Sequence, residues 1–278
     1  MPAGFRAELF KLRKRTLCWL IAGVWLAMSL LFGYVFPYFG YRASAGSREI
    51  AERVFTQALP AGLVPTSIQG FPLFAGVLAL LLGVLCAGGE YGWQTMKVIF
   101  TQGPPRLSLL AGKLSALLVL MLVIVSATFV LDAAAAWLVA AVESRPMDWP
   151  PPGELARGVL AGWLIVGMWA GFGLFLGFLV RGTAVALGPG LVWALVVETV
   201  LRALGPVSAP AEAVQRWFPG TNAGALAAAL GVGRQGEPGG TPGVTAAVGG
   251  VQAAIVLAGY LAIFAAISAF LLNRRDIT

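Results

Sequence analysis

The chain has 278 residues, of which 59% are hydrophobic and only 11% are charged, and its formal net charge is +7. A soluble domain has about 45–50% apolar and about 25% charged residues, so this composition excludes a soluble globular protein and indicates an integral membrane protein. The sequence contains no histidine, which excludes catalysis and metal binding that depend on histidine. The two cysteines, Cys18 and Cys86, do not form a CxxC pair, so neither a zinc site nor a redox pair is expected.

An amphipathic helix is predicted before the first apolar segment, over residues 4–16. Its apolar side chains recur at helical spacing and form one narrow stripe: Phe5, Leu9, Leu12 and Thr16. Most of the basic residues fall elsewhere around this helix, namely Lys11, Arg13, Lys14 and Arg15. Such a helix is expected to lie in the headgroup layer with its stripe in lipid. Two roles stay open at this point: a positively charged anchor, or an elbow that also braces a cytoplasmic partner.

Apolar segments long enough to cross a bilayer, which needs about 20 residues for each helix, recur along the rest of the chain. In chain order we predict spans at 17–38, 71–88, 108–141, 157–180, 184–202 and 247–272. The expected fold class is therefore an all-α integral membrane protein with six transmembrane helices in a single domain, residues 1–278. Residues 203–246 are expected to form an external loop.

Basic residues concentrate at one end of the predicted bundle. Six spans place both termini on the same side, which carries 11 basic residues, including all four lysines, against three acids. The other side carries eight arginines against seven acids outside the spans. Because positive residues favour the cytoplasmic face, both termini and residues 89–106 are expected in the cytoplasm. The net charge then follows from membrane topology, and no nucleic-acid partner is expected.

A polar insert, GEYGWQTMKVIFTQGPPRLSLLAGK, occupies residues 89–113 between the second and third spans. A short helix within it should end by Gly103–Pro104–Pro105, because prolines lack a donor and clash with a continuing helix. Lys113 is expected to snorkel at the base of the third span. These local features are compatible with an ordinary solvated loop or with a rigid element that receives force from a soluble partner.

Two acids fall inside the predicted spans, Asp132 in the third and Glu198 near the end of the fifth. A charged group at mid-span costs about 2.5–3.5 kcal/mol. Each acid is expected toward the external half of its helix, where outer headgroups or a neighbour such as Arg202 would compensate it. The alternative is that one of them lines an export path or couples to protons.

The polar insert resembles the cytoplasmic loop of ABC-2-type transporter permeases, the membrane subunits of many bacterial exporters. That loop has an acid and often a tyrosine at the end of the second span. A threonine, a short helix, a second threonine, a proline, a basic residue and a lysine follow. The matching positions here are Glu90, Tyr91, Thr95, Thr101, Pro105, Arg106 and Lys113. Gln94 replaces the glycine that usually precedes the first threonine. AELFKLRKRTLCW, RWFPGTNAGALA and FLLNRRDI also resemble family segments, so the resemblance covers nearly the whole chain.

The resemblance implies a plasma-membrane permease that pairs with a second copy or a sister permease and docks onto ABC ATPase subunits. Residues 4–16 would be its elbow helix and residues 89–106 would contain its coupling helix. ATP and Mg²⁺ would belong to the partner ATPase, because this chain has no GxxxxGK[ST] phosphate loop. The chain is thus expected to have no catalytic site or cofactor of its own. The substrate, a drug, antibiotic, peptide or lipid, stays open.

Two other functions remain compatible with the sequence. A proton-coupled secondary transporter would use Asp132 or Glu198 and would need no ATPase. The sequence has no visible internal repeat, whereas an inverted repeat would favour that class. A permease-like immunity or signalling subunit would share the loop and the ATPase but would move no substrate.

Overall fold

The computed structural model describes residues 2–43, 48–92, 105–204 and 208–274. Within these ranges the chain is helical and contains no strand. Among the described residues, six helical segments are long and apolar enough to cross a membrane: Thr16–Ala43, Pro60–Tyr91, Arg106–Val142, Pro152–Val180, Thr183–Leu204 and Gly250–Arg274. The prediction of an all-helical chain with six candidate spans is confirmed.

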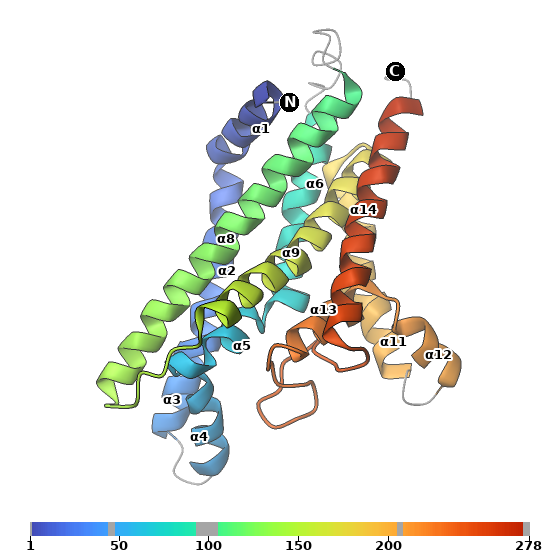
Figure 1. Ribbon diagram of the computed structural model, residues 1–278. Helices are drawn as coiled ribbons and strands as arrows, with labels where there is room; N and C mark the ends of the chain where they lie inside the picture. Colours follow the sequence, from blue (N-terminus) through green and yellow to red (C-terminus); the bar gives the residue numbers. More distant parts are fainter. Residues whose placement is uncertain (1, 44–47, 93–104, 205–207, 275–278) are drawn as a thin grey trace.

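Shorter elements make up or join these segments (Figure 1). The first segment comprises α2 (Thr16–Leu30), η1 (Leu31–Val35) and α3 (Phe36–Ala43), and it follows α1 (Pro2–Lys14). The second comprises η2 (Pro60–Gly62), α5 (Leu63–Ile68), η3 (Phe71–Ala75) and α6 (Gly76–Gly92), after α4 (Arg48–Gln57). The third and fourth are α8 (Arg106–Val142) and α9 (Pro152–Val180). The fifth comprises α10 (Thr183–Leu191), η4 (Val192–Val197) and α11 (Glu198–Leu204); α12 (Ala209–Gln215), α13 (Pro219–Ala228) and α14 (Gly250–Arg274) follow.

The second apolar helical segment begins earlier than the sequence suggested. Its predicted start was residue 71, where the apolar run FPLFAGVLALLLGVLCAG begins. Instead, Pro60 opens a 3₁₀ turn, and Pro72 lies in the first turn of the π-helical segment η3. A proline in a first turn removes no intrahelical hydrogen bond, so the chain bends there without leaving the helical region.

The two ends of the bundle carry different elements. Figure 1 shows α1 and the C-terminal end of α14 at one end, and α3 and α4 at the other. The end of α6 and the start of α8, which flank residues 93–104, lie with α1. An even number of long helices returns the chain to the side on which it started. Accordingly, α1 and the C-terminal end of α14 lie at the same end of the bundle, as predicted.

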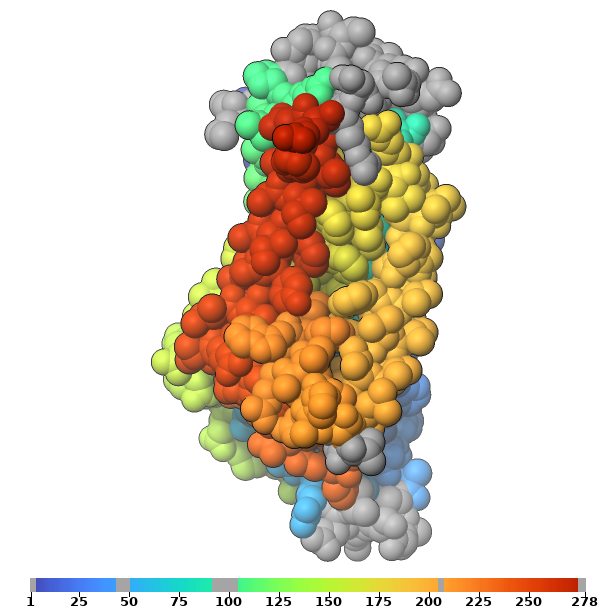
Figure 2. Space-filling view, turned by 90° about the vertical axis from the view of Figure 1, so that its right-hand side faces the viewer, coloured from blue at the N-terminus to red at the C-terminus, as the bar shows by residue number. Residues whose placement is uncertain are grey.

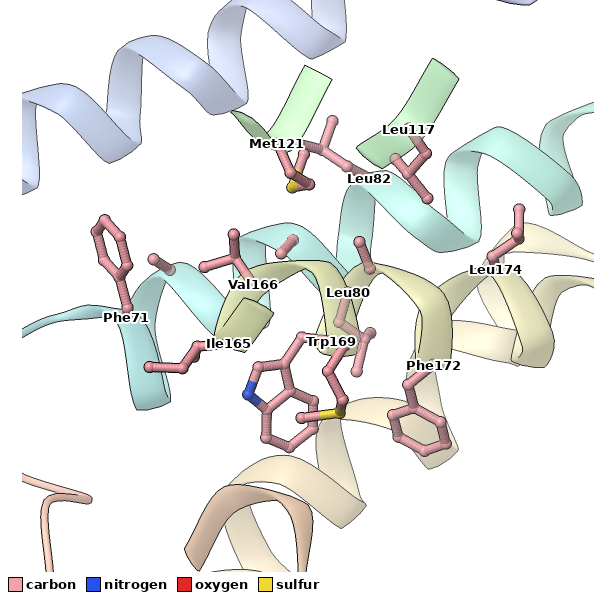
Figure 3. Packing of buried hydrophobic residues seen from close by; sticks show 14 of the residues in the cluster. Phe71, Leu80, Leu82, Leu117, Met121, Ile165, Val166, Trp169, Phe172 and Leu174 are labelled. Atoms are coloured by element: carbon pink, nitrogen blue, oxygen red, sulfur yellow. The ribbon is translucent and has the colours of Figure 1, made fainter. Parts of the chain in front are cut away.

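The centre of the bundle is the contact between α6 and α9, with α8 packed over it (Figure 3). A Cβ on Gly83 would lie 2.0 Å from the Ala170 carbonyl oxygen, and a Cβ on Gly173 would lie 2.1 Å from the Leu80 carbonyl oxygen. Neither position has room for a side chain, because the two backbones touch there. The glycines of the fourth span therefore serve packing within the chain.

Residues 203–246, which the sequence predicts to be an external loop, contain the packed helix α13. Within them, α13 packs against α14, and every residue from Pro219 to Ala227 is buried. Its composition explains this burial, since the small side chains of PGTNAGALAA let the helix approach its neighbours closely. The short helix thus belongs to the bundle interior.

The outward faces of the long helices are apolar. Val130 on α8, Val185 on α10 and Val251 on α14 are 68%, 68% and 78% exposed. Figure 2 shows the side of the molecule on which α14 lies beside the fifth segment. Apolar surface of this extent needs a lipid or protein cover, as expected of a membrane bundle.

Candidate functional site

Four charged side chains meet where α1, the end of α6 and the start of α8 come together. They are Glu8 and Lys11 on α1, Glu90 on α6 and Lys113 on α8, and we call them the coupling-end cluster. The Lys113 Nζ lies 2.7 Å from Glu90 Oε1 and 3.0 Å from Glu8 Oε2. The Lys11 Nζ lies 2.8 Å from Glu8 Oε1 and 2.9 Å from Glu90 Oε1. Each lysine therefore bridges the same two carboxylates.

The cluster is buried, and its charges balance. Lys113 is fully buried, Glu90 and Glu8 are 2% and 4% exposed, and only the Lys11 side chain reaches solvent. Two ammonium groups face two carboxylates, so the charges balance within this cluster. Lys113 also donates a hydrogen bond to the Cys86 carbonyl at 3.3 Å. Burial lowers the pKa of Lys11, but hydrogen bonds to Glu8 and Glu90 outweigh it and raise that pKa above its ordinary value.

Lys113 thus differs from its sequence-based expectation. It does not snorkel toward solvent from the base of the third span, because α1 covers it and supplies Glu8 as a partner. The cover fits closely: a Cβ on Gly112 would lie 3.1 Å from the Gly4 carbonyl carbon. A glycine at this position therefore lets α1 lie directly on α8.

The apolar stripe of α1 also faces protein more than lipid. Leu12 is 3% exposed, and Phe5 and Leu9 pack against the hydrophobic core, whereas Thr16 is exposed. The expectation of a stripe in lipid is corrected accordingly, because the stripe completes the packing between α1 and α8.

The other basic residues of the elbow divide between protein and surface. The Arg15 Nη1 donates a 2.8 Å hydrogen bond to the Leu85 carbonyl of α6, so this guanidinium ties the junction of α1 and α2 to the second long segment. Arg13 and Lys14 are exposed beside the exposed Phe10 and Trp19 rings. The side chains of Arg13 and Lys14 are therefore open to the surroundings of the protein.

Three further predicted residues connect this region to the rest of the bundle. Pro105 immediately precedes α8. Arg106 opens that helix, and its Nη1 donates to the Leu272 carbonyl at 2.8 Å and the Asn273 carbonyl at 3.2 Å, at the end of α14. The Tyr91 ring meets the Phe178 ring of α9 edge-on, with 6.4 Å between centroids. Contacts thus run from both flanks of residues 93–104 to α9 and α14.

The structure brings Lys11, Glu90 and Lys113 together, and it adds Glu8, which was not predicted as a site residue. A signal existed in the sequence: Glu8 is the one acid in a basic amphipathic segment, and it lies one helical turn from Leu12 of the apolar stripe. Two predicted residues, Thr95 and Thr101, lie outside the described residues.

Asp132 and Glu198 belong to other parts of the bundle. Asp132 is fully buried, and Ser29 Oγ donates to its two oxygens at 3.2 and 3.0 Å. Glu198 is 1% exposed and accepts a 2.8 Å hydrogen bond from the Gly220 backbone N–H, in the first turn of α13.

Both acids are therefore enclosed by the helices of the bundle itself. Arg202 does not bridge Glu198 through an ion pair in the described structure, but donates instead to the Gly243 carbonyl and the Thr199 hydroxyl. Among the described residues, no group of three or more aspartate, glutamate or cysteine side chains is placed to hold a metal ion.

The sequence matches the family described as "ABC-2 family transporter protein" over residues 5–197. This range contains all four residues of the coupling-end cluster, together with Arg106. A comparison with curated proteins gives no match. Membrane proteins of the matched family typically lack catalytic activity and rely on a partner ATPase. Because the match covers more than half of the 278 residues, the chain belongs to the ABC-2 family of transporter membrane proteins.

Proposed function

We propose that this chain is the permease subunit of an ATP-driven exporter, which moves an amphipathic substrate out across the plasma membrane. A separate ABC ATPase would bind ATP and Mg²⁺ and supply the energy. Family membership supports this proposal, and the position of the coupling-end cluster carries it. The cluster joins α6 and α8, the two helices that flank residues 93–104, to α1.

The proposed mechanism transmits a push on residues 93–104 through these contacts. Glu90 lies in the last turn of α6, and Lys113 lies close to the start of α8. Their ion pair makes the two helix ends move together, and Lys11 and Glu8 couple α1 to the same motion. Arg106 extends the connection to α14. The proposal requires that this packed unit has two stable arrangements, so that a local push becomes a shift of whole helices.

The proposed orientation places this end of the bundle in the cytoplasm. The support is the charge distribution along the sequence, which puts all four lysines on this side. Arg13 and Lys14 would then contact lipid phosphates of the inner leaflet. The exposed apolar faces would be covered by lipid and by a second permease, either another copy or a sister subunit.

The test is affinity purification of the tagged chain from its native membrane in mild detergent. Mass spectrometry then identifies any co-purifying polypeptide with a GxxxxGK[ST] motif, and its ATP hydrolysis is measured with the permease bound. Arg106→Ala is expected to lower this hydrolysis, because it breaks the connection between α8 and α14. Arg157→Ala, an exposed arginine near the start of α9, is the matched control and is expected to have no effect.

The choice of Arg106 avoids a complication at Glu90. Removing the Glu90 carboxylate would leave Lys113 with one fewer partner in the interior, and the fold itself would suffer. Failure to recover an ATPase with an intact permease would overturn the proposal. If ATP hydrolysis fell equally in the Arg106 and Arg157 variants, the proposed coupling path through Arg106 would be wrong.

A further inference from the structure

A cavity of about 650 Å³ lies between the first and second apolar segments. Aromatic and aliphatic side chains form most of its wall, including Trp25 and Phe32 on one side and Phe71 and Phe74 on the other. Residues 239–242 and Gln57 border it toward the end that carries α4. Its volume falls within the range of about 300–1,000 Å³ that is usual for small-molecule sites.

The cavity is bordered by all three π-helical segments of the described chain. Phe32 belongs to η1, Phe74 to η3 and Leu195 to η4, and each of these residues lines the cavity. A π-helical turn shifts the side chains after it out of α-helical register and is frequent at functional sites. Three helices thus deviate from regular geometry around one space.

A buried acid lies behind the wall of this cavity. Ser29 lines the cavity, and its hydroxyl donates to both oxygens of Asp132. Asp132 is fully buried, and within the described chain it takes part in no ion pair. The Ser67 hydroxyl also faces this carboxylate. Neutral hydroxyls compensate a buried carboxylate poorly, since such a group normally needs a cation or several strong donors.

We infer that the cavity binds an amphipathic amine, with an apolar body against the aromatic wall and one cationic nitrogen at Ser29 and Ser67. The nitrogen would lie in front of Asp132 and offset its charge. The described residues that line the cavity include neither lysine nor arginine. An anionic headgroup would therefore find no cationic partner in this wall. This inference rests on the proposed function and names the substrate class that the permease would take.

The experiment is photolabelling of the full-length chain in membrane vesicles. The probes are two alkyl diazirines of equal chain length, one ending in a primary amine and the other in an alcohol. The amine is expected to label peptides from residues 24–37 and 71–78, which line the cavity. Asp132→Asn is expected to reduce labelling by the amine about tenfold, which corresponds to about 1.4 kcal/mol of binding free energy. Labelling by the alcohol should not change.

Two further variants keep the result interpretable. Glu198→Gln neutralises a buried acid that does not line the cavity, and it should leave amine labelling unchanged. Val77→Phe fills the cavity from α6 without touching Asp132, and it should reduce amine labelling even if the Asp132 variant does not fold.

Two outcomes would overturn the inference. One is equal labelling by amine and alcohol with no effect of Asp132→Asn. The other is amine labelling confined to the outer helix faces. The measurement needs no ATPase, so failure of the exporter proposal would leave its result intact.

Discussion

Lys113 of α8 and Glu90 of α6 form a 2.7 Å ion pair that α1 covers from outside. The pair joins the two helices that flank residues 93–104, and Glu8 and Lys11 extend it to α1. The helix ends that precede and follow residues 93–104 are therefore joined in one buried network of ion pairs.

Lys113→Ala is expected to destabilise the fold by about 3–5 kcal/mol, because it removes the buried ammonium group that Glu8 and Glu90 share. The measurement is the thermal unfolding midpoint of the detergent-solubilised chain. Lys113→Met combined with Glu90→Gln keeps the cluster neutral and should be less destabilised than Lys113→Ala. Arg13→Ala, at an exposed position of α1, should stay within about 0.5 kcal/mol of the parent chain. A double variant less stable than Lys113→Ala would contradict this account.

Gly112→Leu is expected to lift α1 from α8. The new side chain would meet the backbone at Gly4, where a Cβ would already lie 3.1 Å from the carbonyl carbon. Overpacking of this kind costs about 1–3 kcal/mol. A cysteine pair across α1 and α8 reports the separation through its cross-linking yield, which should fall. Unchanged cross-linking would show that α1 reaches Lys113 without this close contact.

Gly83→Ala and Gly259→Ala should change stability in opposite directions. A Cβ at Gly83 would collide with the Ala170 carbonyl of α9, whereas nothing lies within 4 Å of a Cβ at Gly259 of α14. Alanine at the open position should stabilise its helix by about 0.5–1 kcal/mol. Thermal unfolding of the two variants beside the parent chain tests the contrast. A Gly83 variant as stable as the parent would mean that α6 and α9 are not in backbone contact.

Glu198→Gln should be tolerated better than Glu198→Leu. Glutamine keeps an oxygen that accepts the Gly220 N–H, whereas leucine leaves this donor in the first turn of α13 unpaired. An unsatisfied buried donor costs about 1–3 kcal/mol. Protease sensitivity of residues 208–249 would report loosening of α13, and equal sensitivity in the two variants would show that the hydrogen bond does not hold that helix.

Much of the architecture was accessible from the order of residues. The apolar segments from Thr16 onward predict the long helices. The clustering of lysines predicts that the two termini and residues 89–106 lie at the same end of the bundle. The resemblance of residues 89–113 to the cytoplasmic loop of ABC-2-type permeases identified Glu90, Arg106 and Lys113 as residues of interest. These properties are local or additive along the chain, so they are visible without a fold.

Other relationships needed the packed structure. The partnership of Glu8 with Lys113 spans helices far apart in sequence, and the burial of α13 depends on its contacts with neighbouring helices. The cavity beside Ser29 depends on where three π-helical segments meet.

The sequence by itself determined that the chain is a helical membrane protein with six candidate spans and a basic end, because hydropathy and charge are properties of segments. Only the tertiary structure decided which charged side chains pair, which buried acid lies next to the cavity wall and at which glycines two helix backbones come into contact. Those outcomes depend on distances between helices, and helix packing sets them through side-chain volume and the need to compensate every buried charge.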